Sequence, residues 1–387
     1  MKLEILAFVK YYLPGYKSGG PIRTIANMVD RLGDEFNFRI VTSDRDALDE
    51  KSYPHIAINE WNRVGKALVY YASPGKRSLL NWVKVIRGTH HSILYLNSFF
   101  DPVYTFRPLL ARRFGLIPNR PVIIAPRGEL SLGALELKRL KKAPYMALGM
   151  VSGLYKNLTW QASSKHEAND ISRTMRYISK RIVIASNLPT INDFKLEFDP
   201  LGRREGPLQI VFLSRISPMK NLEFALNVVS KVRYPIIFNI YGPVRDDNYW
   251  RKCKSLIANM PENVSISYKG SVENSEVSSI IGSHDLFFLP TLGENFGHVI
   301  LEALSAGTPV LIADTTPWRN LEEFGVGWSL PLCKEESYVD CINYAASQNS
   351  EYYKTWRKRV RAYAIEHFND PGNAENNRKL FVDASLL

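Results

Sequence analysis

Hydrophobic residues occur along the first part of the chain in short runs, separated by polar segments rich in glycine and proline. Residues 3–9 form an apolar run of strand length, followed by a Gly/Pro loop over 14–20. Apolar positions then repeat at helical spacing over 21–33, and residues 36–42 form a second run. Strand, loop, helix and strand with short connections are typical of a parallel, doubly wound sheet.

The same pattern continues and is repeated in the second half of the chain. The further expected strands are 68–72, 93–97, 121–125, 158–162, 208–213, 236–241, 264–268, 285–289 and 309–313. The expected helices of the second half are 221–232, 245–259, 273–282 and 297–306, and residues 350–381 are also helical in pattern. The pattern therefore predicts an α/β protein with two doubly wound halves, which suits 387 residues at a typical ~150 residues per domain.

A linker is expected over residues 186–207, which hold three prolines, two glycines and mixed charge. We therefore predict an N-terminal domain over 1–190 and a C-terminal domain over 205–365, with a helix at about 370–387 returning to the first domain. Two hinged α/β halves imply a cleft, because open α/β sheets bind ligands at the carboxyl ends of their strands.

Composition excludes several classes of protein. Hydrophobic residues make up 45% and charged residues 23% of the chain, which is ordinary for a globular protein. No apolar run approaches the ~18 residues of a membrane span, and the N-terminus lacks the pattern of a signal peptide. Three scattered cysteines are too few for a disulfide framework or a zinc site. We therefore expect a cytoplasmic protein with reduced thiols.

The net charge of +12 is concentrated in one half of the chain. Residues 1–200 hold 30 basic and 17 acidic residues, whereas residues 201–387 hold 20 and 21. Within the first half, residues 51–150 alone hold 16 basic and 4 acidic residues. Such a basic field attracts phosphates, anionic lipid surfaces or nucleic acid, and the alternative is an ordinary solvated surface.

The loop after the first strand contains Gly19 and Gly20, where the backbone can approach a ligand closely. A helix starts at once, and a helix N-terminus favours phosphate. The spacing is neither the GxGxxG of dinucleotide-binding proteins nor a Walker A loop. A turn that needs positive φ explains the loop equally well.

A second candidate follows the strand 208–213. Arg215 lies just beyond the carboxyl end of this strand, and Lys220 lies near the start of the next expected helix, where a cation is unfavourable without an anionic ligand. The planar guanidinium of an arginine together with the ammonium of a lysine suits a diphosphate ligand. The alternative interpretation is that both residues are solvated surface cations.

Two glutamates stand out in the second half. Seven residues separate Glu294 from Glu302, so a helical rise would place their Cα atoms about 12 Å apart. A glycosidase carboxylate pair needs about 5–9.5 Å between its carboxyl groups, so this separation is too large for such a pair. It suits two carboxylates that hold different parts of one extended ligand. Glu302 has apolar neighbours, and sugar hydroxyls could supply its partners. The N–H groups of Asn295, Phe296 and Gly297 lie at a helix start and can meet a phosphate.

These residues resemble the donor site of the retaining, nucleotide-sugar-dependent glycosyltransferases of family four. The resemblance covers nearly the whole chain and is carried by segments 214–221, 293–302 and 306–310 and by the Gly-rich first loop. It implies the GT-B fold, with two Rossmann-like domains that face a central cleft. Segments 125–130 and 316–318 resemble a branch common in bacterial surface-polysaccharide assembly.

The resemblance also implies roles for single residues. Arg215 and Lys220 would bind the donor diphosphate and stabilise the leaving group, and Glu294 would act at the transferred sugar. Glu302 would bind the ribose. The remaining donor contacts would come from Asn295, Phe296, Gly297, Gly19 and Gly20.

The N-terminal half departs from the family pattern at one point. Many relatives have a histidine near the reacting sugar, whereas this chain offers Arg127, Gly128 and Glu129 as possible acceptor or sugar contacts. His166, which follows the strand 158–162, is expected to be structural.

The expected function is therefore transfer of a sugar, with retention, from a nucleotide-diphosphate sugar to a hydroxyl of a glycan or polyprenyl-diphosphate-linked acceptor. The resemblance implies O-antigen, capsule or exopolysaccharide synthesis at the inner face of the plasma membrane, with an anionic membrane surface as partner and no metal or other cofactor. A nucleotide-sugar epimerase of the same architecture is the main alternative. A nucleic-acid-binding protein would explain the charge but not the segment around Glu294, and the missing GxGxxG disfavours a dehydrogenase.

Overall fold

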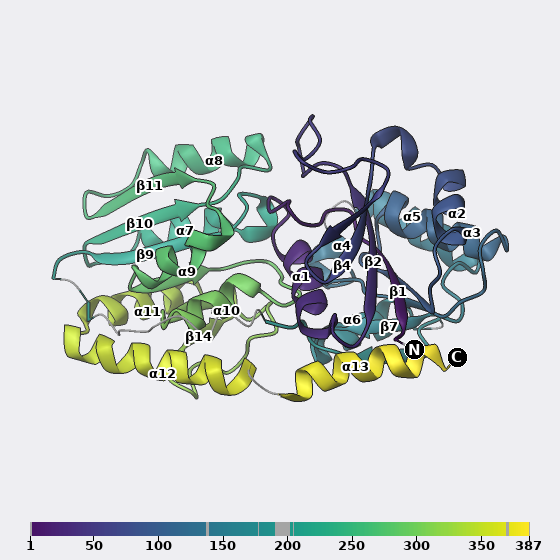
Figure 1. The fold of residues 1–387 in the computed structure, drawn as a ribbon. Coiled ribbons are helices and arrows are strands. Elements are labelled where there is room, and N and C mark those ends of the chain that lie inside the picture. Colours follow the sequence, from purple (N-terminus) through teal and green to yellow (C-terminus); the bar gives the residue numbers. More distant parts are fainter. Residues whose placement is uncertain are drawn as a thin grey trace. The chain divides into compact units, whose positions relative to one another are not determined.

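The computed structural model describes residues 2–136, 139–176, 178–189, 202–203, 205–368 and 371–386. The chain divides into two compact units, one formed by Met1–Thr190 with Pro371–Leu387 and the other by Ile191–Asp370. Each unit is built on one sheet with helices against it (Figure 1). Of the linker expected over 186–207, residues 190–201 and 204 lie outside the described part.

The first unit has a sheet with the strand order β3-β4-β2-β1-β5-β6-β7-β8. Its strands are β1 (Glu4–Phe8), β2 (Asn37–Ser43), β3 (Trp61–Val64), β4 (Ala67–Ala72), β5 (Ile93–Leu96), β6 (Val122–Ile124), β7 (Thr159–Ala162) and β8 (Arg181–Ile184). Its α-helices are α1 (Gly20–Leu32), α2 (Leu79–Arg87), α3 (Arg107–Arg113), α4 (Leu132–Glu136), α5 (Arg139–Val151), α6 (Lys165–Thr174) and α13 (Pro371–Ser385). The pairing is parallel except between β3 and β4, which are antiparallel.

Successive side chains along these strands point to opposite faces of the sheet, and they form one hydrophobic core on each face. In β1, Ile5 and Ala7 join one core, whereas Leu6 and Phe8 join the other. Helix α13 covers the first face, where the Phe381 ring lies within 5.5–6.0 Å of three other aromatic rings. A strand buried on both faces reads as a continuous apolar run, which explains why residues 3–9 could be recognised in the sequence.

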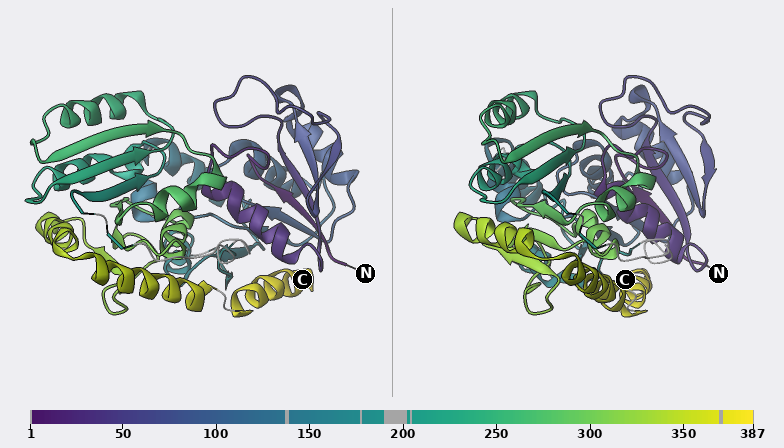
Figure 2. Two further views of the ribbon diagram at one scale, coloured as in Figure 1. Left: turned by 60° about the vertical axis from the view of Figure 1, so that its left-hand side comes forward. Right: turned by 90° about the vertical axis from the view of Figure 1, so that its left-hand side faces the viewer.

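The second unit has a parallel sheet with the order β11-β10-β9-β12-β13-β14. Its strands are β9 (Leu208–Leu213), β10 (Ile236–Tyr241), β11 (Val264–Gly270), β12 (Leu286–Leu289), β13 (Val310–Ala313) and β14 (Gly327–Leu330). Its α-helices are α7 (Leu222–Val229), α8 (Asp247–Ile257), α9 (Asn274–Gly282), α10 (His298–Ser305), α11 (Glu335–Ser347) and α12 (Ser350–Phe368). Helix α7 contacts α8 and α11, and α10 contacts α9 and α12, so both faces of the sheet are covered (Figure 2).

The expected strands and the expected helices of the second half agree with the structure to within a few residues at most ends. The tail, expected to be helical over 350–381 and to return to the first domain at about 370–387, forms two helices, α12 in the second unit and α13 in the first. Among the described residues, no helix has the length and hydropathy needed to cross a bilayer.

Candidate functional site

Two loops meet at the carboxyl ends of the neighbouring strands β9 and β12. The carbonyl oxygen of Met219, in the first loop, accepts hydrogen bonds from Leu292 N (2.8 Å) and Thr291 Oγ1 (3.0 Å) in the second. The chain adds strands first on one side of β9 and then on the other, so this edge is the topological switch point of the second unit. Ligands of open α/β sheets bind at such points.

Lys220 and Glu294 form an ion pair between these loops. Only 9% of the Lys220 side chain and 14% of the Glu294 side chain are exposed. Burial lowers the pKa of Lys220, Glu294 raises it, and the nearby charge of Arg215 lowers it further. Lys220 ends a short 3₁₀ helix (Pro218–Lys220) before α7, and the anion that sequence reasoning assigned to a ligand is supplied by the chain itself.

Arg215 lies beyond the end of β9, as its position in the sequence indicates. Solvent reaches its side chain, but the surrounding protein atoms displace part of the hydration, and this desolvation lowers the pKa of the guanidinium. The Glu294 carboxylate raises this pKa and the Arg245 guanidinium lowers it, so both of these charges lie within electrostatic reach of Arg215. Arginine keeps its charge in proteins, so the site holds a permanent cation.

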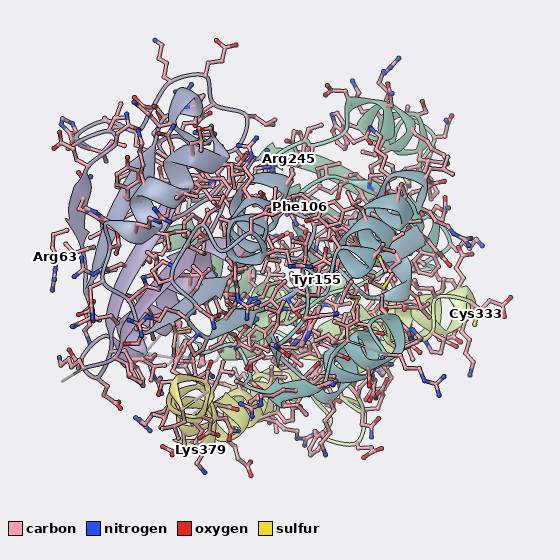
Figure 3. The ribbon with its side chains drawn as sticks, turned by 90° about the vertical axis from the view of Figure 1, so that its right-hand side faces the viewer. Arg63, Phe106, Tyr155, Arg245, Cys333 and Lys379 are labelled. Carbon is pink, nitrogen blue, oxygen red and sulfur yellow. The ribbon has the colours of Figure 1, made fainter. Side chains whose placement is uncertain are left out.

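Arg245, labelled in Figure 3, is a candidate that sequence reasoning missed. It follows β10, and its amide donates to the Ile216 carbonyl oxygen (3.0 Å), while Ile216 N donates to Pro243 O (2.9 Å). These bonds place the loops after β9 and β10 side by side. The signal was available, because Arg245 follows the carboxyl end of an expected strand in the same way as Arg215.

Helix α10 begins beside these loops, at Gly297. Gly297 has φ 76°, a left-handed backbone conformation that favours glycine. The Trp318 indole N–H donates to the Phe296 carbonyl oxygen (2.5 Å) and holds the backbone that enters the helix. Asn295 and Glu294 precede the helix, so a helical rise does not set the distance between Glu294 and Glu302, contrary to the estimate from the sequence.

Glu302 lies in the middle of α10 with 4% of its surface exposed. The first-turn N–H groups of any helix lack partners within the helix, so the start of α10 offers donors and partial positive charge. The second unit therefore carries the two glutamates, two cationic side chains and a helix N-terminus that the sequence indicated, with Arg245 in addition.

In the first unit, Gly19 has φ 63° and immediately precedes helix α1, which begins at Gly20. The Asp46 carboxylate accepts hydrogen bonds from Tyr16 N (2.7 Å) and Lys17 N (2.9 Å), which fixes the preceding loop. A Cβ atom at Gly19 would meet no atom within 4 Å, so the need for glycine there is conformational.

Arg127 has φ 57° and is held inside the first unit by side-chain hydrogen bonds. Its Nε donates to Asn97 Oδ1 (2.7 Å), Nη1 donates to Asn187 Oδ1 (2.5 Å), and Nη2 donates to the Tyr95 hydroxyl. Tyr95 in turn donates to Gln161 Oε1 (2.6 Å). The guanidinium therefore belongs to a polar network within this unit.

Glu129 is likewise engaged by its own chain. Its carboxylate accepts hydrogen bonds from Phe99 N (2.6 Å), Phe100 N (2.9 Å) and Ser98 Oγ (2.9 Å). Burial raises the pKa of Glu129, and these hydrogen bonds oppose the increase. The Glu129 carboxylate thus anchors the loop after β5.

Gly128 and His166 have local partners. The Gly128 amide donates to Glu167 Oε1 (2.6 Å). The half-exposed His166 lies 3.7 Å from an oxygen of Asp170, one turn further along α6. Among the residues that the structure describes, no cluster of three or more His, Cys, Asp or Glu side chains is arranged to hold a metal ion.

Comparison with known families identifies the segment that contains this site. Residues 193–363 match the family described as glycosyl transferases group 1. This segment is similar to the group 1 glycosyl transferases. Arg215, Lys220, Arg245, Glu294 and Glu302 all lie within it.

Two curated glycosyltransferases resemble parts of the chain. Sulfoquinovosyl transferase SQD2 of Arabidopsis thaliana is 33% identical over 113 residues, which are 29% of this chain and 20% of that protein. The O-antigen chain mannosyltransferase B of Escherichia coli is 28% identical over 173 residues, or 40% of this chain and 42% of that protein. The chain thus matches less than half of the length of either relative.

A solved structure matches the whole chain. The Anabaena protein Alr3699/HepE, crystallised with UDP and glucose, superposes with a TM-score of 0.72 over 100% of both chains, at 15% identity. At this identity the likeness concerns the fold. It confirms the GT-B fold expected from the sequence.

Proposed function

We propose that the chain transfers a sugar from a nucleotide-diphosphate sugar to a hydroxyl group of a glycan acceptor, with retention of configuration. The observation that supports this best is the grouping of Arg215 and Lys220 around Glu294 at the switch point of the second unit, with Arg245 near Arg215. Several cations around one carboxylate suit a ligand that is anionic at its diphosphate and rich in hydroxyls at its sugar.

In this proposal the donor diphosphate lies against Arg215 and Lys220, with the start of α10 contributing N–H groups. The bond between the sugar C1 and the phosphate oxygen breaks, and its electron pair stays on the diphosphate. The acceptor hydroxyl attacks the same face of an oxocarbenium-like sugar, and its proton passes to the departing phosphate. Preorganised positive charge lowers the barrier because negative charge grows on the leaving group.

Glu294 has two roles in this scheme. It positions the Lys220 ammonium through the ion pair, and its remaining acceptor capacity is directed to the transferred sugar. We assign Glu302, which is buried in α10, to the ribose hydroxyls, the role that the resemblance implies for it. Gly19 and Gly20 remain candidates for further donor contacts, and Arg127, Gly128 and Glu129 for acceptor contacts.

The acceptor is proposed to be a lipid-linked glycan of cell-surface polysaccharide assembly, bound by the N-terminal unit near an anionic membrane. The charge excess of residues 51–150 and the resemblance to an O-antigen mannosyltransferase support this. The matched family and relatives are transferases, so the epimerase alternative is not favoured. We also propose that no metal is required, and turnover that persists undiminished in excess chelator would support this.

Donor binding tests the proposal directly. A panel of uridine-, guanosine- and adenosine-diphosphate sugars is added to the protein, and the donor that binds should raise the melting temperature. The Arg215→Ala variant should lose this shift. If no donor in the panel stabilises the protein, the proposal fails. With the donor known, proton NMR of the product reads the anomeric configuration, and an inverted product would exclude the retaining mechanism.

A further inference from the structure

A cavity of about 360 Å³ lies in the second unit, beside the start of strand β14 and helices α11 and α12, which are labelled in Figure 1. Four aromatic side chains and two carboxylates line it: Trp328, Tyr344, Tyr352, Trp356, Glu322 and Asp340. The cavity is at the amino end of β14, whereas the loops of the candidate donor site follow the carboxyl ends of β9 and β12. The sheet is parallel, so these ends lie at opposite edges and the cavity is separate from the donor site.

The four aromatic rings form a closed circuit. The centroid of the Trp328 ring lies 5.5 Å from that of Trp356, at an interplanar angle of 81°, and 6.0 Å from that of Tyr344, at 85°. The Tyr352 ring completes the circuit, 5.6 Å from Trp356 at 62° and 6.3 Å from Tyr344 at 84°. Neighbouring rings thus meet at steep angles, as the walls of a box do. The faces of aromatic rings carry partial negative charge and attract cations.

Hydrogen-bonding groups around the cavity are bonded to the protein itself. The hydroxyl groups of Tyr344 and Tyr352 lie 2.9 Å apart and share a hydrogen bond. The Trp356 indole N–H donates to a backbone carbonyl oxygen of the loop before β14 (2.9 Å). Glu322 Oε1 accepts a hydrogen bond from Ser329 N (2.7 Å). A sugar, whose hydroxyls need several donors and acceptors, would have to compete with these bonds.

The two carboxylates give the cavity negative charge. Burial raises the pKa of the Cys341 thiol, and the carboxylates of Glu322 and Asp340 add to this effect, bringing the value to about 12. Both charges therefore reach the same part of the cavity. Burial also raises the pKa of Tyr352 to about 12, and the exposed Arg359 guanidinium opposes this increase. The carboxylates that line the cavity thus outnumber this guanidinium.

We propose that this cavity binds a small quaternary alkylammonium cation. The aromatic walls attract the positive charge, and the carboxylates add attraction over a longer range. A quaternary nitrogen has no N–H group and needs no hydrogen-bond acceptor, so it matches a site whose polar groups already bond to one another. The inference goes beyond sugar transfer and does not depend on the donor site.

Isothermal titration calorimetry of the full chain with choline tests this inference. We expect saturable binding of choline and little binding of 3,3-dimethylbutan-1-ol, which has the shape of choline without its charge. Trp328→Ala should weaken choline binding about tenfold or more, the change expected when a desolvated contact between a cation and an aromatic face is lost. Asp340→Asn should weaken it about threefold, since this carboxylate is exposed and acts through solvent.

Trp328 also packs against the core of the unit, so a second variant is needed at a more exposed ring. Tyr344 is 46% exposed, and Tyr344→Ala should weaken choline binding about threefold or more. The matched control is Tyr234→Ala, a 40% exposed tyrosine outside the cavity, which should bind choline as the wild type does. Unchanged melting temperatures show that the variants are folded. Arg215→Ala should keep choline binding, which separates failure here from failure of the proposed transfer activity.

Four results would overturn the inference. One is a wild-type chain that does not bind choline. Another is equal binding of choline and its neutral analogue, because the cavity would then recognise an apolar shape alone. Unchanged choline binding in both Trp328→Ala and Tyr344→Ala would place the cation elsewhere on the protein. Binding of glucose in place of choline, lost in the same two variants, would make the cavity a sugar site.

Discussion

The ammonium group of Lys220 forms an ion pair with the carboxylate of Glu294, although 74 positions separate the two residues in the sequence. Both side chains are largely shielded from solvent, so each charge depends on the other, and loss of one partner would leave a buried charge uncompensated. The pair connects the loops after β9 and β12. It holds a cation at the point where we propose that the donor diphosphate binds.

Loss of either cation should reduce turnover. Arg215→Ala and Lys220→Ala should each lower kcat by about 10²–10³, the size expected when a stabiliser of leaving-group charge is removed. Arg215 is exposed, so its variant should keep the wild-type melting temperature. The exposed Lys254→Ala on α8 serves as the control and should leave kcat unchanged. Near-normal turnover of the Arg215 variant would contradict the assigned role.

Arg245 should contribute to donor affinity. Removing a charge-assisted contact costs about 1.5–3 kcal/mol, so Arg245→Ala should raise the KM for the donor about tenfold or more. Arg245→Lys should recover part of the loss, because it restores the charge without the fork. Steady-state kinetics with varied donor provides the measurement, and an unchanged KM would remove Arg245 from the site.

The pH dependence of kcat/KM should show the environment of Lys220. Burial lowers the pKa of Lys220, so its ammonium loses its proton at a pH below the ordinary lysine pKa of 10.5. Activity should fall at that lower pH. Lys220→Arg should move this basic limb to higher pH. Between the lowered pKa and 10.5 the unfolded chain binds more protons than the folded one, so the contribution of Lys220 to stability rises with pH over the window in which activity falls. If the basic limb of the pH profile stays at the same pH in the Lys220→Arg variant, another group is responsible for it.

Gly242 should be intolerant of a side chain. It has φ 130°, and a Cβ atom there would lie 1.9 Å from the Ser214 carbonyl oxygen, next to Arg215. Gly242→Ala should lower the free energy of unfolding by about 2 kcal/mol or more. Gly75→Ala is the control, since a Cβ atom at Gly75 would meet nothing within 4 Å. Denaturant unfolding compares the two, and equal stability would contradict the steric argument.

Variants of Glu129 can distinguish a structural role of this residue from a contact with the acceptor. Glu129→Ala leaves the Phe99 and Phe100 amides without their acceptor, which should cost about 1–3 kcal/mol of stability. Glu129→Gln keeps an acceptor oxygen and should cost less. Thermal melting and turnover are measured together. Reduced turnover at an unchanged melting temperature would instead indicate that Glu129 contacts a substrate.

Much of the fold could be predicted because its signals are local. Strands buried on both faces, such as β1 and β9, read as apolar runs in the sequence, and α1 is recognised by its helical period between glycines. The helical pattern of residues 350–381 was also recognised, and the structure divides it between α12 and α13.

The candidate site was predictable only in part. Positions at strand ends identified Arg215 and Glu294 as candidates, and the same rule, applied after β10, would have found Arg245. The assignment of an external anion to Lys220 missed its pairing with Glu294, because sequence spacing contains no information about which loops are neighbours. For the same reason, the internal hydrogen bonds of Arg127 and Glu129 could not be foreseen.

The amino-acid sequence by itself determined where strands and helices form, the α/β class, and which half carries the positive charge, since each depends on residues close together in the chain or on their sum. Tertiary structure alone decided that β9 and β12 are neighbours, so that Lys220 meets Glu294. Strand order and helix packing depend on contacts between residues far apart in the chain, and these form only when the whole unit has folded.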